Sequence, residues 1–366
     1  MDGENLPRYG LRRLLAVLGV LVVVGLVAGA VGLLGTGGGG GGRVSSPTGG
    51  SGAGTSAASP GTRAPSLSGI PVGRWVARAP ARLARSEVSA AVVGGAAYVV
   101  GGFGSDLRST AAVERLDLGS GRWSTSTPLP RPLNHMSAVG YGGALYVVGG
   151  YSQLSDTSAG AVRDFWRFDP VGRRWSAMPP APLARAAAGA AILGHRLYVA
   201  GGRSDTQTTI ASLAIFDFDT GRWSLGPSLH HAREHVAAVA AGGAIWLLGG
   251  RALGQGNFAD VERLTPGARA WERRAPMPLA RSSFQAVAAG GKVVVVGGED
   301  AGSTFGEVDA MAPASERWTR LADLPRPRHG LGLVADGPLV YAIEGGPQAG
   351  LTTSRAVDRL RVGSTG

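Results

Sequence analysis

The chain has 366 residues, 44% of them hydrophobic, and is long enough for one large domain with appended segments. It contains no cysteine, which excludes disulfides, thiolate nucleophiles, thiolate metal ligands and an anchor on a lipid-modified cysteine. The formal net charge of +11 is compatible with a nucleic acid, an anionic polymer or an acidic peptide as partner and does not select among them.

An apolar segment lies near the N-terminus. Residues Leu14 to Gly35 form a run of 22 residues without a charge. As a helix this run is about 33 Å long, which is sufficient to span the apolar part of a bilayer. Arg8, Arg12 and Arg13 precede it, so the positive-inside rule predicts a signal anchor with the following domain on the extracytoplasmic side of the cell membrane.

A cleaved signal peptide is the alternative interpretation of this run. Ala28-Gly-Ala30 contains the small residues of a cleavage site, and cleavage there makes Val31 the first residue of a secreted protein. The run continues past Ala30, which favours the anchor. From Thr36 to about Ser68 the chain is rich in Gly, Ser, Thr and Pro, a composition that predicts a disordered tether.

The rest of the chain is repetitive. Six apolar runs, of which Ala144 to Val148 is typical, each stop at two glycines, and the spacings between the first glycines are 48, 52, 48, 48 and 48 residues. The glycine pairs are Gly101-Gly102, Gly149-Gly150, Gly201-Gly202, Gly249-Gly250, Gly297-Gly298 and Gly345-Gly346. Six tryptophans recur with nearly the same period, at spacings of 48, 52, 48, 48 and 47 residues: Trp75, Trp123, Trp175, Trp223, Trp271 and Trp318. A period near fifty residues indicates a repeat architecture.

Each repeat contains four short strand patterns. An apolar segment such as Ser137 to Gly140 comes first, the run ending in the glycine pair is second, an alternating segment such as Val113 to Leu118 is third, and the Trp opens the fourth. Such sheets bury their faces against copies of themselves around an axis. The glycine pair with a downstream Trp resembles the Kelch repeat family over about Gly73 to Val362. The resemblance implies an all-β, six-bladed Kelch β-propeller.

The two ends of the propeller are predicted to share a blade. Trp75 opens a fourth strand with no earlier partner, whereas the last repeat has three strands, up to Ala356 to Leu360, and no Trp. The N-terminal strand should therefore complete the C-terminal sheet as its outer strand. The predicted segments are a cytoplasmic N-terminus at 1–13, a transmembrane helix at 14–35, a linker at 36–72, the propeller at 73–362 and a tail at 363–366.

One arginine recurs in the turn before the first strand. It lies 13 residues before a fixed position of the second strand in five repeats, and Leu133 replaces it in the remaining one. Because the first strand of a blade is innermost, we expect these residues around the mouth of the central channel. Either they bind an anion through their guanidinium groups, or they hold neighbouring loops together. They are Arg85, Arg185, Arg233, Arg281 and Arg328.

Other candidates should share this face. Residues that follow the glycine pairs include Tyr151, Arg203 and Arg251, together with Phe103 and Glu299. Three histidines lie within two residues of the recurrent arginine position and could be metal ligands, acid–base groups or ordinary loop residues: His135, His235 and His329. The predicted ligand-binding set adds His135, His235, Tyr151, Arg203 and Arg251 to the five arginines. We expect no metal and no cofactor.

Two functions are compatible with these residues. The first is a binding module for an anionic ligand, a glycan or an acidic protein segment, with no nucleic acid expected. The second is an enzyme similar to the bacterial sialic acid mutarotases, which are exported six-bladed Kelch propellers, with Glu87, Arg233, Glu234 and His235 near the mouth for acid–base work. The Kelch-like oxidases need a cysteine cross-linked to tyrosine beside copper, so their mechanism is excluded.

Overall fold

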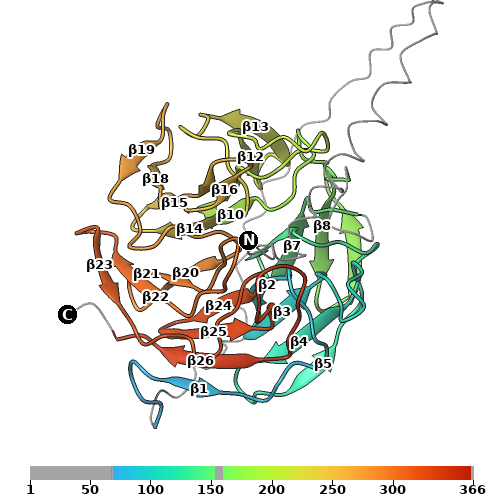
Figure 1. Cartoon of the computed structure of the whole chain (residues 1–366). Helices are drawn as coiled ribbons and strands as arrows, with labels where there is room; N and C mark the ends of the chain where they lie inside the picture. The colour runs from blue at the N-terminus through green and yellow to red at the C-terminus, as the bar shows by residue number, and fades with distance from the viewer. Residues whose placement is uncertain (1–66, 68, 153–159, 364–366) are drawn as a thin grey trace, which may run out of the picture. The chain divides into compact units, whose positions relative to one another are not determined.

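Six four-stranded antiparallel sheets form a ring of blades in the part of the chain that the structure describes, residues 67, 69–152 and 160–363 (Figure 1). The computed structural model thus confirms the six-bladed β-propeller. The inner strands are β2 (Ser89–Val93), β6 (Ser137–Tyr141), β10 (Gly189–Leu193), β14 (Ala237–Ala241), β20 (Gln285–Ala289) and β24 (Gly332–Asp336). Each inner strand contacts the inner strand of the next blade around the whole ring, so these strands form the wall of the central channel.

The second and third strands complete the middle of each blade. The second strands are β3 (Ala96–Val100), β7 (Ala144–Val148), β11 (Arg196–Ala200), β15 (Ala244–Leu248), β21 (Lys292–Val296) and β25 (Leu339–Ile343). The third strands are β4 (Val113–Asp117), β8 (Phe165–Asp169), β12 (Leu213–Asp217), β18 (Val261–Leu264), β22 (Val308–Ala312) and β26 (Val357–Arg361).

The outer strands are β5 (Trp123–Thr125), β9 (Arg174–Ala177), β13 (Arg222–Gly226), β19 (Glu272–Arg274), β23 (Arg317–Arg320) and β1 (Trp75–Ala77). A small hairpin, β16 (Arg251–Ala252) and β17 (Gly256–Asn257), follows the glycine pair of blade 4. Blades are numbered 1 to 6 from β2 to β24.

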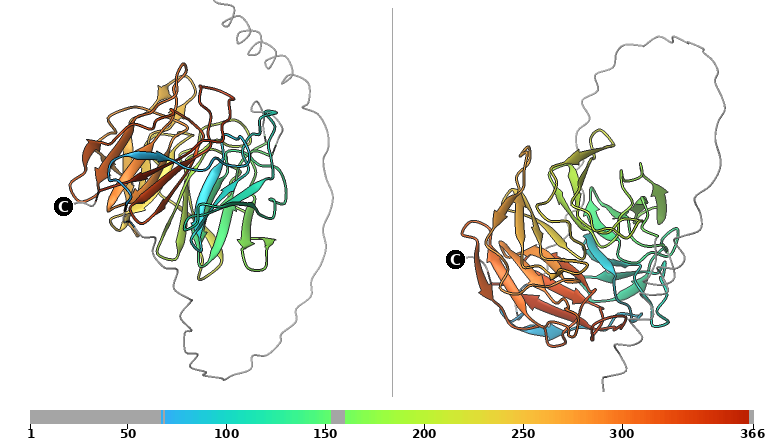
Figure 2. Two further views of the ribbon diagram at one scale, coloured as in Figure 1. Left: turned by 90° about the horizontal axis from the view of Figure 1, so that it is seen from below. Right: turned by 45° about the horizontal axis from the view of Figure 1, so that its top comes forward.

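The ring closes as the sequence predicts. The last sheet has the order β1-β26-β25-β24, and Trp75 of β1 pairs with Leu360 of β26. In all views β1, at the blue end of the chain, lies along the edge of the red C-terminal sheet (Figure 1 and Figure 2). The ends of the domain are therefore joined by strand pairing without a disulfide.

The hydrophobic core lies between blades. One buried cluster joins Val99 and Leu116 of blade 1 to Tyr341 and Val357 of blade 6, and equivalent clusters fill the other interfaces. The second strands supply most of this surface; β3, β7, β15 and β25 are buried along their whole length. This explains why those runs read as continuous apolar segments in the sequence.

The recurrent tryptophans also join blades. The indole N–H of Trp271 donates a hydrogen bond to the carbonyl oxygen of Pro227, in the loop that leaves the preceding blade, at 2.9 Å. The same bond recurs at Trp75, Trp123, Trp175, Trp223 and Trp318, with donor–acceptor distances from 2.8 to 3.4 Å. Each Trp therefore anchors its outer strand to a neighbouring blade, which accounts for its fixed period.

The glycine pairs allow a close approach between blades. The N–H of Gly202 donates to the carbonyl oxygen of Arg233 in the next blade at 2.9 Å, and a Cβ on Gly201 would lie 2.7 Å from that oxygen. In blade 6 the interpretation of Gly345-Gly346 as the pair is wrong by one residue. Gly345 makes the equivalent bond, to Arg85, and Glu344 with φ +58° occupies the first position.

The predicted membrane helix at 14–35 and most of the linker at 36–72 lie outside the described residues. Within the described ranges, no helix is long and apolar enough to cross a membrane.

Candidate functional site

The recurrent arginine is buried in each of the five blades that carry it. In blade 5, Arg281 Nη1 donates to the carbonyl oxygens of Gly297 and Glu307 at 3.0 and 2.8 Å, and Nη2 donates to Asp309 at 2.7 Å. The side chain thus ties the loop before the inner strand to the second and third strands of its own blade. At most 1% of each of these residues is exposed: Arg85, Arg185, Arg233, Arg281 and Arg328.

Four of these guanidinium groups pair with a carboxylate on the third strand. The pairs, with their N–O distances, are Arg85–Glu114 at 3.3 Å, Arg233–Glu262 at 2.6 Å, Arg281–Asp309 at 2.7 Å and Arg328–Asp358 at 2.8 Å. Glu114 and Glu262 are both buried with their arginines.

Arg185 differs from the other four. It has no carboxylate partner among the described residues, and its guanidinium donates to Ser212 Oγ and to three backbone carbonyls. Burial lowers its pKa to about 10. The five arginines therefore do not surround the channel opening as the sequence analysis expected, because each side chain turns into its own blade, where it binds backbone carbonyls, a carboxylate or both.

A second recurrent position, two residues beyond the arginine, does face the channel. Its backbone is left-handed in every blade, with φ from +50° to +56°: Glu87, His135, Ala187, His235, Ser283 and Gly330. Neighbouring members are joined by backbone hydrogen bonds; His135 donates to Glu87 at 3.2 Å and Ala187 to His135 at 2.8 Å. We call these six residues the mouth ring. All six members line one small cavity at this end of the channel.

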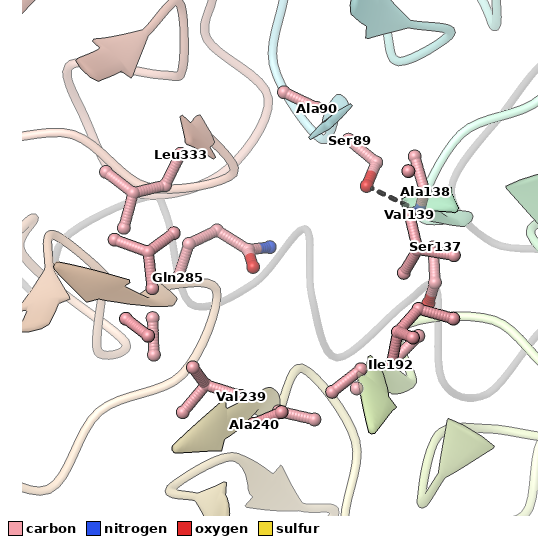
Figure 3. A pocket seen from close by; sticks show the side chains of 18 of the residues that line it. Ser89, Ala90, Ser137, Ala138, Val139, Ile192, Val239, Ala240, Gln285 and Leu333 are labelled. Atoms are coloured by element: carbon pink, nitrogen blue, oxygen red, sulfur yellow. Dashed lines mark hydrogen bonds between the residues drawn. The ribbon is translucent and has the colours of Figure 1, made fainter. Parts of the chain in front are cut away.

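The channel behind the mouth ring is lined by small, uncharged side chains for the most part. A cavity of about 280 Å³ is lined mainly by alanines and valines of the six inner strands (Figure 3). Among the labelled residues, Gln285 reaches toward the middle of the space, whereas the hydroxyl of Ser89 accepts a hydrogen bond from the backbone N–H of Ala138 at 2.9 Å (Figure 3). A separate cavity of about 30 Å³ is lined by Glu87, His135, His235 and Ser283 of the mouth ring, among other residues.

Glu87 lies at the centre of a buried charge cluster. One carboxylate oxygen lies 3.2 Å from His135 Nε2 and the other 3.0 Å from His329 Nδ1. Burial alone would raise the pKa of Glu87, but the facing histidines lower it well below its ordinary value. Burial alone would lower the pKa of His329, but its hydrogen bond to Glu87 raises it above its ordinary value. The pair is therefore held as a carboxylate and an imidazolium.

Arg251 joins a second part of the same cluster. Its guanidinium contacts Glu234 at 3.3 Å and Glu299 at 3.0 Å, and Nη2 lies 3.3 Å from His235 Nε2. Ser283 Oγ donates to Glu299 at 3.0 Å. Burial acts to raise the pKa of Glu234, but His235 and the nearby arginines lower it to about 2. The Arg251 side chain is 35% exposed, so this cation is open to solvent at the mouth.

The predicted site residues thus separate into two groups. The structure brings His135, His235, Tyr151, Arg203 and Arg251 to the channel mouth. Tyr151, Arg203 and Arg251, which follow glycine pairs, each form an isolated β-bridge with the residue just before a mouth-ring position. It places the five recurrent arginines inside the blades. Sequence reasoning did not assign Ser283 or Glu299 to the ligand site. Aligning the repeats at the mouth-ring position would have identified Ser283, since this position changes in chemical type from blade to blade.

A family model described as the KLHDC2/KLHL20/DRC7 Kelch-repeats domain matches residues 74–227 and 190–354. A search of curated protein sequences found no match. The solved structure of YjhT superposes with a TM-score of 0.66 and 17% sequence identity, covering 76% of this chain and 95% of that one. At this identity the likeness shows the fold alone.

Proposed function

Because the chain belongs to the Kelch-repeat family, we propose that it is a binding module whose ligand occupies the channel mouth. The observation that carries this proposal is the convergence of three glutamates, three histidines and Arg251 at one end of a channel that is lined mainly by alanines and valines. The ligand would approach from solvent along the channel axis and meet Arg251 first.

These charges are not required by the fold. Buried ionised groups cost free energy unless they are paired, and even good pairs are often no better than apolar residues. Blade 3 closes its part of the mouth ring with Ala187 and blade 5 with Ser283, at the same backbone geometry. A neutral residue therefore suffices at this position. Ionisable groups with shifted pKa values cluster at functional sites.

A small anion that also carries hydroxyl groups fits the mouth best. Arg251 and the half-buried Arg203 provide guanidinium groups for a carboxylate, and Glu234 and Glu299 can accept hydrogen bonds from hydroxyls. An acidic sugar has both kinds of group. In this proposal the five recurrent arginines are structural, and residues 14–35 hold the propeller on the extracytoplasmic side of the membrane.

Calorimetric titration of the full chain with a panel of acidic sugars and acidic peptides tests this proposal. Arg251→Ala should weaken binding about tenfold or more, the effect of losing a charge-assisted hydrogen bond. Arg115→Ala is the matched control, because that side chain is 34% exposed and also paired with an acid, Asp117, but lies on a third strand. The proposal fails if no panel member binds, or if both variants bind like the parent.

An acid–base enzyme of the sugar mutarotase type is the second candidate. The observation in its favour is the Glu87–His329 pair, in which the pKa values of the two groups are displaced in opposite directions. Such an enzyme would speed the exchange between sugar anomers, which NMR follows directly. Glu87→Gln should abolish that acceleration. A parent protein that leaves the exchange rate at its uncatalysed value would exclude this candidate.

A further inference from the structure

Three metal-ligand side chains converge in the mouth ring. Glu87, His135 and His235 come from blades 1, 2 and 4, and one potential ligand atom of each lies within 4.8 Å of the others. The two imidazole rings are 4.8 Å apart between centroids and nearly perpendicular, at 83°. The sequence separates these residues by 48 and 100 positions, so only ring closure brings them together.

Both histidines are held in the tautomer that a metal requires. His135 Nδ1 lies 2.5 Å from Asn134 Oδ1, whose amide nitrogen donates to Ser109 Oγ, so Nδ1 carries the proton. His235 Nδ1 faces the Glu234 carboxylate at 3.4 Å without a hydrogen bond, but Nε2 accepts from Arg251 Nη2 at 3.3 Å, so Nδ1 carries the proton here too. Metal-binding histidines are typically oriented in this way, with one ring nitrogen on an outer oxygen acceptor and the other directed at the ion.

The space among the three side chains is of the right size. The cavity of about 30 Å³ that they line corresponds to one water molecule or one ion. It is too small for the acidic sugar of the proposed function, which would have to lie further out, against Arg251. The small cavity, with two imidazoles and one carboxylate in its lining, is therefore separate from the position proposed for the sugar.

We propose that Glu87, His135 and His235 bind a divalent transition-metal ion, of which Zn²⁺ is the representative. Two imidazole nitrogens and one carboxylate oxygen form a three-ligand site with a fourth position open to water or a ligand. Imidazole ligands favour such ions over Ca²⁺ and Mg²⁺, which prefer oxygen. His329, on the other carboxylate oxygen, would hold Glu87 in place.

Arg251 competes with this ion for His235 Nε2. Its Nη2 lies 3.3 Å from His235 Nε2, the atom that would bind the metal, and must withdraw to Glu234 and Glu299 when the ion enters. The inference goes beyond the proposed function, since the ion can bind with or without an organic ligand. Arg251→Gln separates the two: it should strengthen metal binding, because it removes a competing donor and a positive charge, and weaken binding of the acidic sugar.

The test is calorimetric titration of the tag-free full chain, dialysed against chelator, with ZnCl₂. We expect one ion per chain, no heat with CaCl₂ or MgCl₂, and visible absorption bands when CoCl₂ replaces zinc. His135→Gln and His235→Gln should weaken zinc binding by about 100-fold, and Asn134→Ala, which changes only an outer contact, by about tenfold. His195→Gln is the matched control, since this histidine is exposed and distant from the mouth.

Circular dichroism melting curves show whether each variant is folded. If a histidine variant does not fold, Arg251→Gln still decides the question, because unchanged or weaker zinc binding in that variant contradicts the proposal. Absence of zinc binding to the parent protein, or equal affinity in parent and folded histidine variants, would overturn it. Loss of sugar binding with intact zinc binding would leave this inference standing and refute the proposed function alone.

Discussion

The recurrent arginines and the mouth ring are two sets of residues at repeated positions, two residues apart. They differ in how much the residue type varies from blade to blade and in where the side chains lie. Five of the six blades carry the same residue at the first position, and all five side chains are buried; four donate to backbone carbonyls, and Arg233 donates to Glu262. At the second position the residue type changes around the ring, and ligand atoms of Glu87, His135 and His235 approach one another within 4.8 Å.

This difference shows how to interpret charge in a repeat protein. A charged residue that recurs with the period of the fold interacts with polar groups that also recur. Here these groups are backbone carbonyls and carboxylates of the second and third strands. A charged residue that appears in some repeats only cannot be explained by the repeated architecture. It was the recurrent set that the sequence suggested as the ligand site, whereas the geometry favours the variable set.

The largest expected effect is the loss of one recurrent arginine. Arg281→Ala leaves Asp309 buried without its main partner and frees two carbonyl groups, and should lower the free energy of unfolding by about 3–5 kcal/mol. Urea denaturation measures this, with Arg115→Ala as the exposed control. A loss below about 1 kcal/mol would mean that the recurrent arginines are not braces.

Gly201→Ala should have the next largest effect. The added Cβ would lie 2.7 Å from the Arg233 carbonyl oxygen at a φ of +67°, and we expect a loss of about 3 kcal/mol. Gly194→Ala is the matched control, because its φ of +59° is similar but no atom lies within 4 Å of the new Cβ. It should cost about 1 kcal/mol. Equal losses in urea denaturation would show that close approach between blades is unimportant.

Glu344 gives a pH-dependent test of the brace in blade 1. Burial raises its pKa to about 8; the neighbouring Glu114 adds to the rise, and Arg85, which both carboxylates share, offsets only part of it. In the unfolded chain this group loses its proton near pH 4.5, so folding stability should fall as the pH rises from there to about 8.

Glu344→Gly should remove that loss and the strain of a left-handed glutamate, stabilising the protein by about 1–2 kcal/mol at pH 8 and by less at pH 5. Thermal denaturation at the two pH values measures the difference. The assignment of Glu344 is refuted if the gain is greater at pH 5 than at pH 8.

The smallest expected effect concerns Arg185, the arginine without a carboxylate. Ala214 occupies the position that Glu114 has in blade 1, opposite Val199 on the second strand. Ala214→Glu should provide the missing partner and stabilise the protein by about 1 kcal/mol, since a charge-assisted hydrogen bond offsets burial of the carboxylate. A destabilised Ala214→Glu variant would show that the carbonyls and Ser212 already satisfy Arg185.

Fold and site differ in how far the sequence predicts them. The blade count, the strand order and the closure by Trp75 follow from the period, because the glycine pairs and tryptophans make the same interblade contacts in each repeat. The direction of the arginine side chains does not follow, since spacing places a residue in a loop without saying which carbonyls lie within its reach. The cluster around Glu87 depends on contacts between blades up to 242 positions apart.

The most direct test of the account is the stability of a protein whose mouth ring carries no ionisable side chain. The triple variant Glu87→Ala, His135→Ala and His235→Ala places at three ring positions the residue that blade 3 already has at Ala187. Without added ligand or metal, thermal denaturation should give a melting temperature within about 3 °C of the parent, or higher, since the fold does not require these charges. A melting temperature lower by about 10 °C would show that the mouth charges hold the ring together and would contradict their assignment as a binding site.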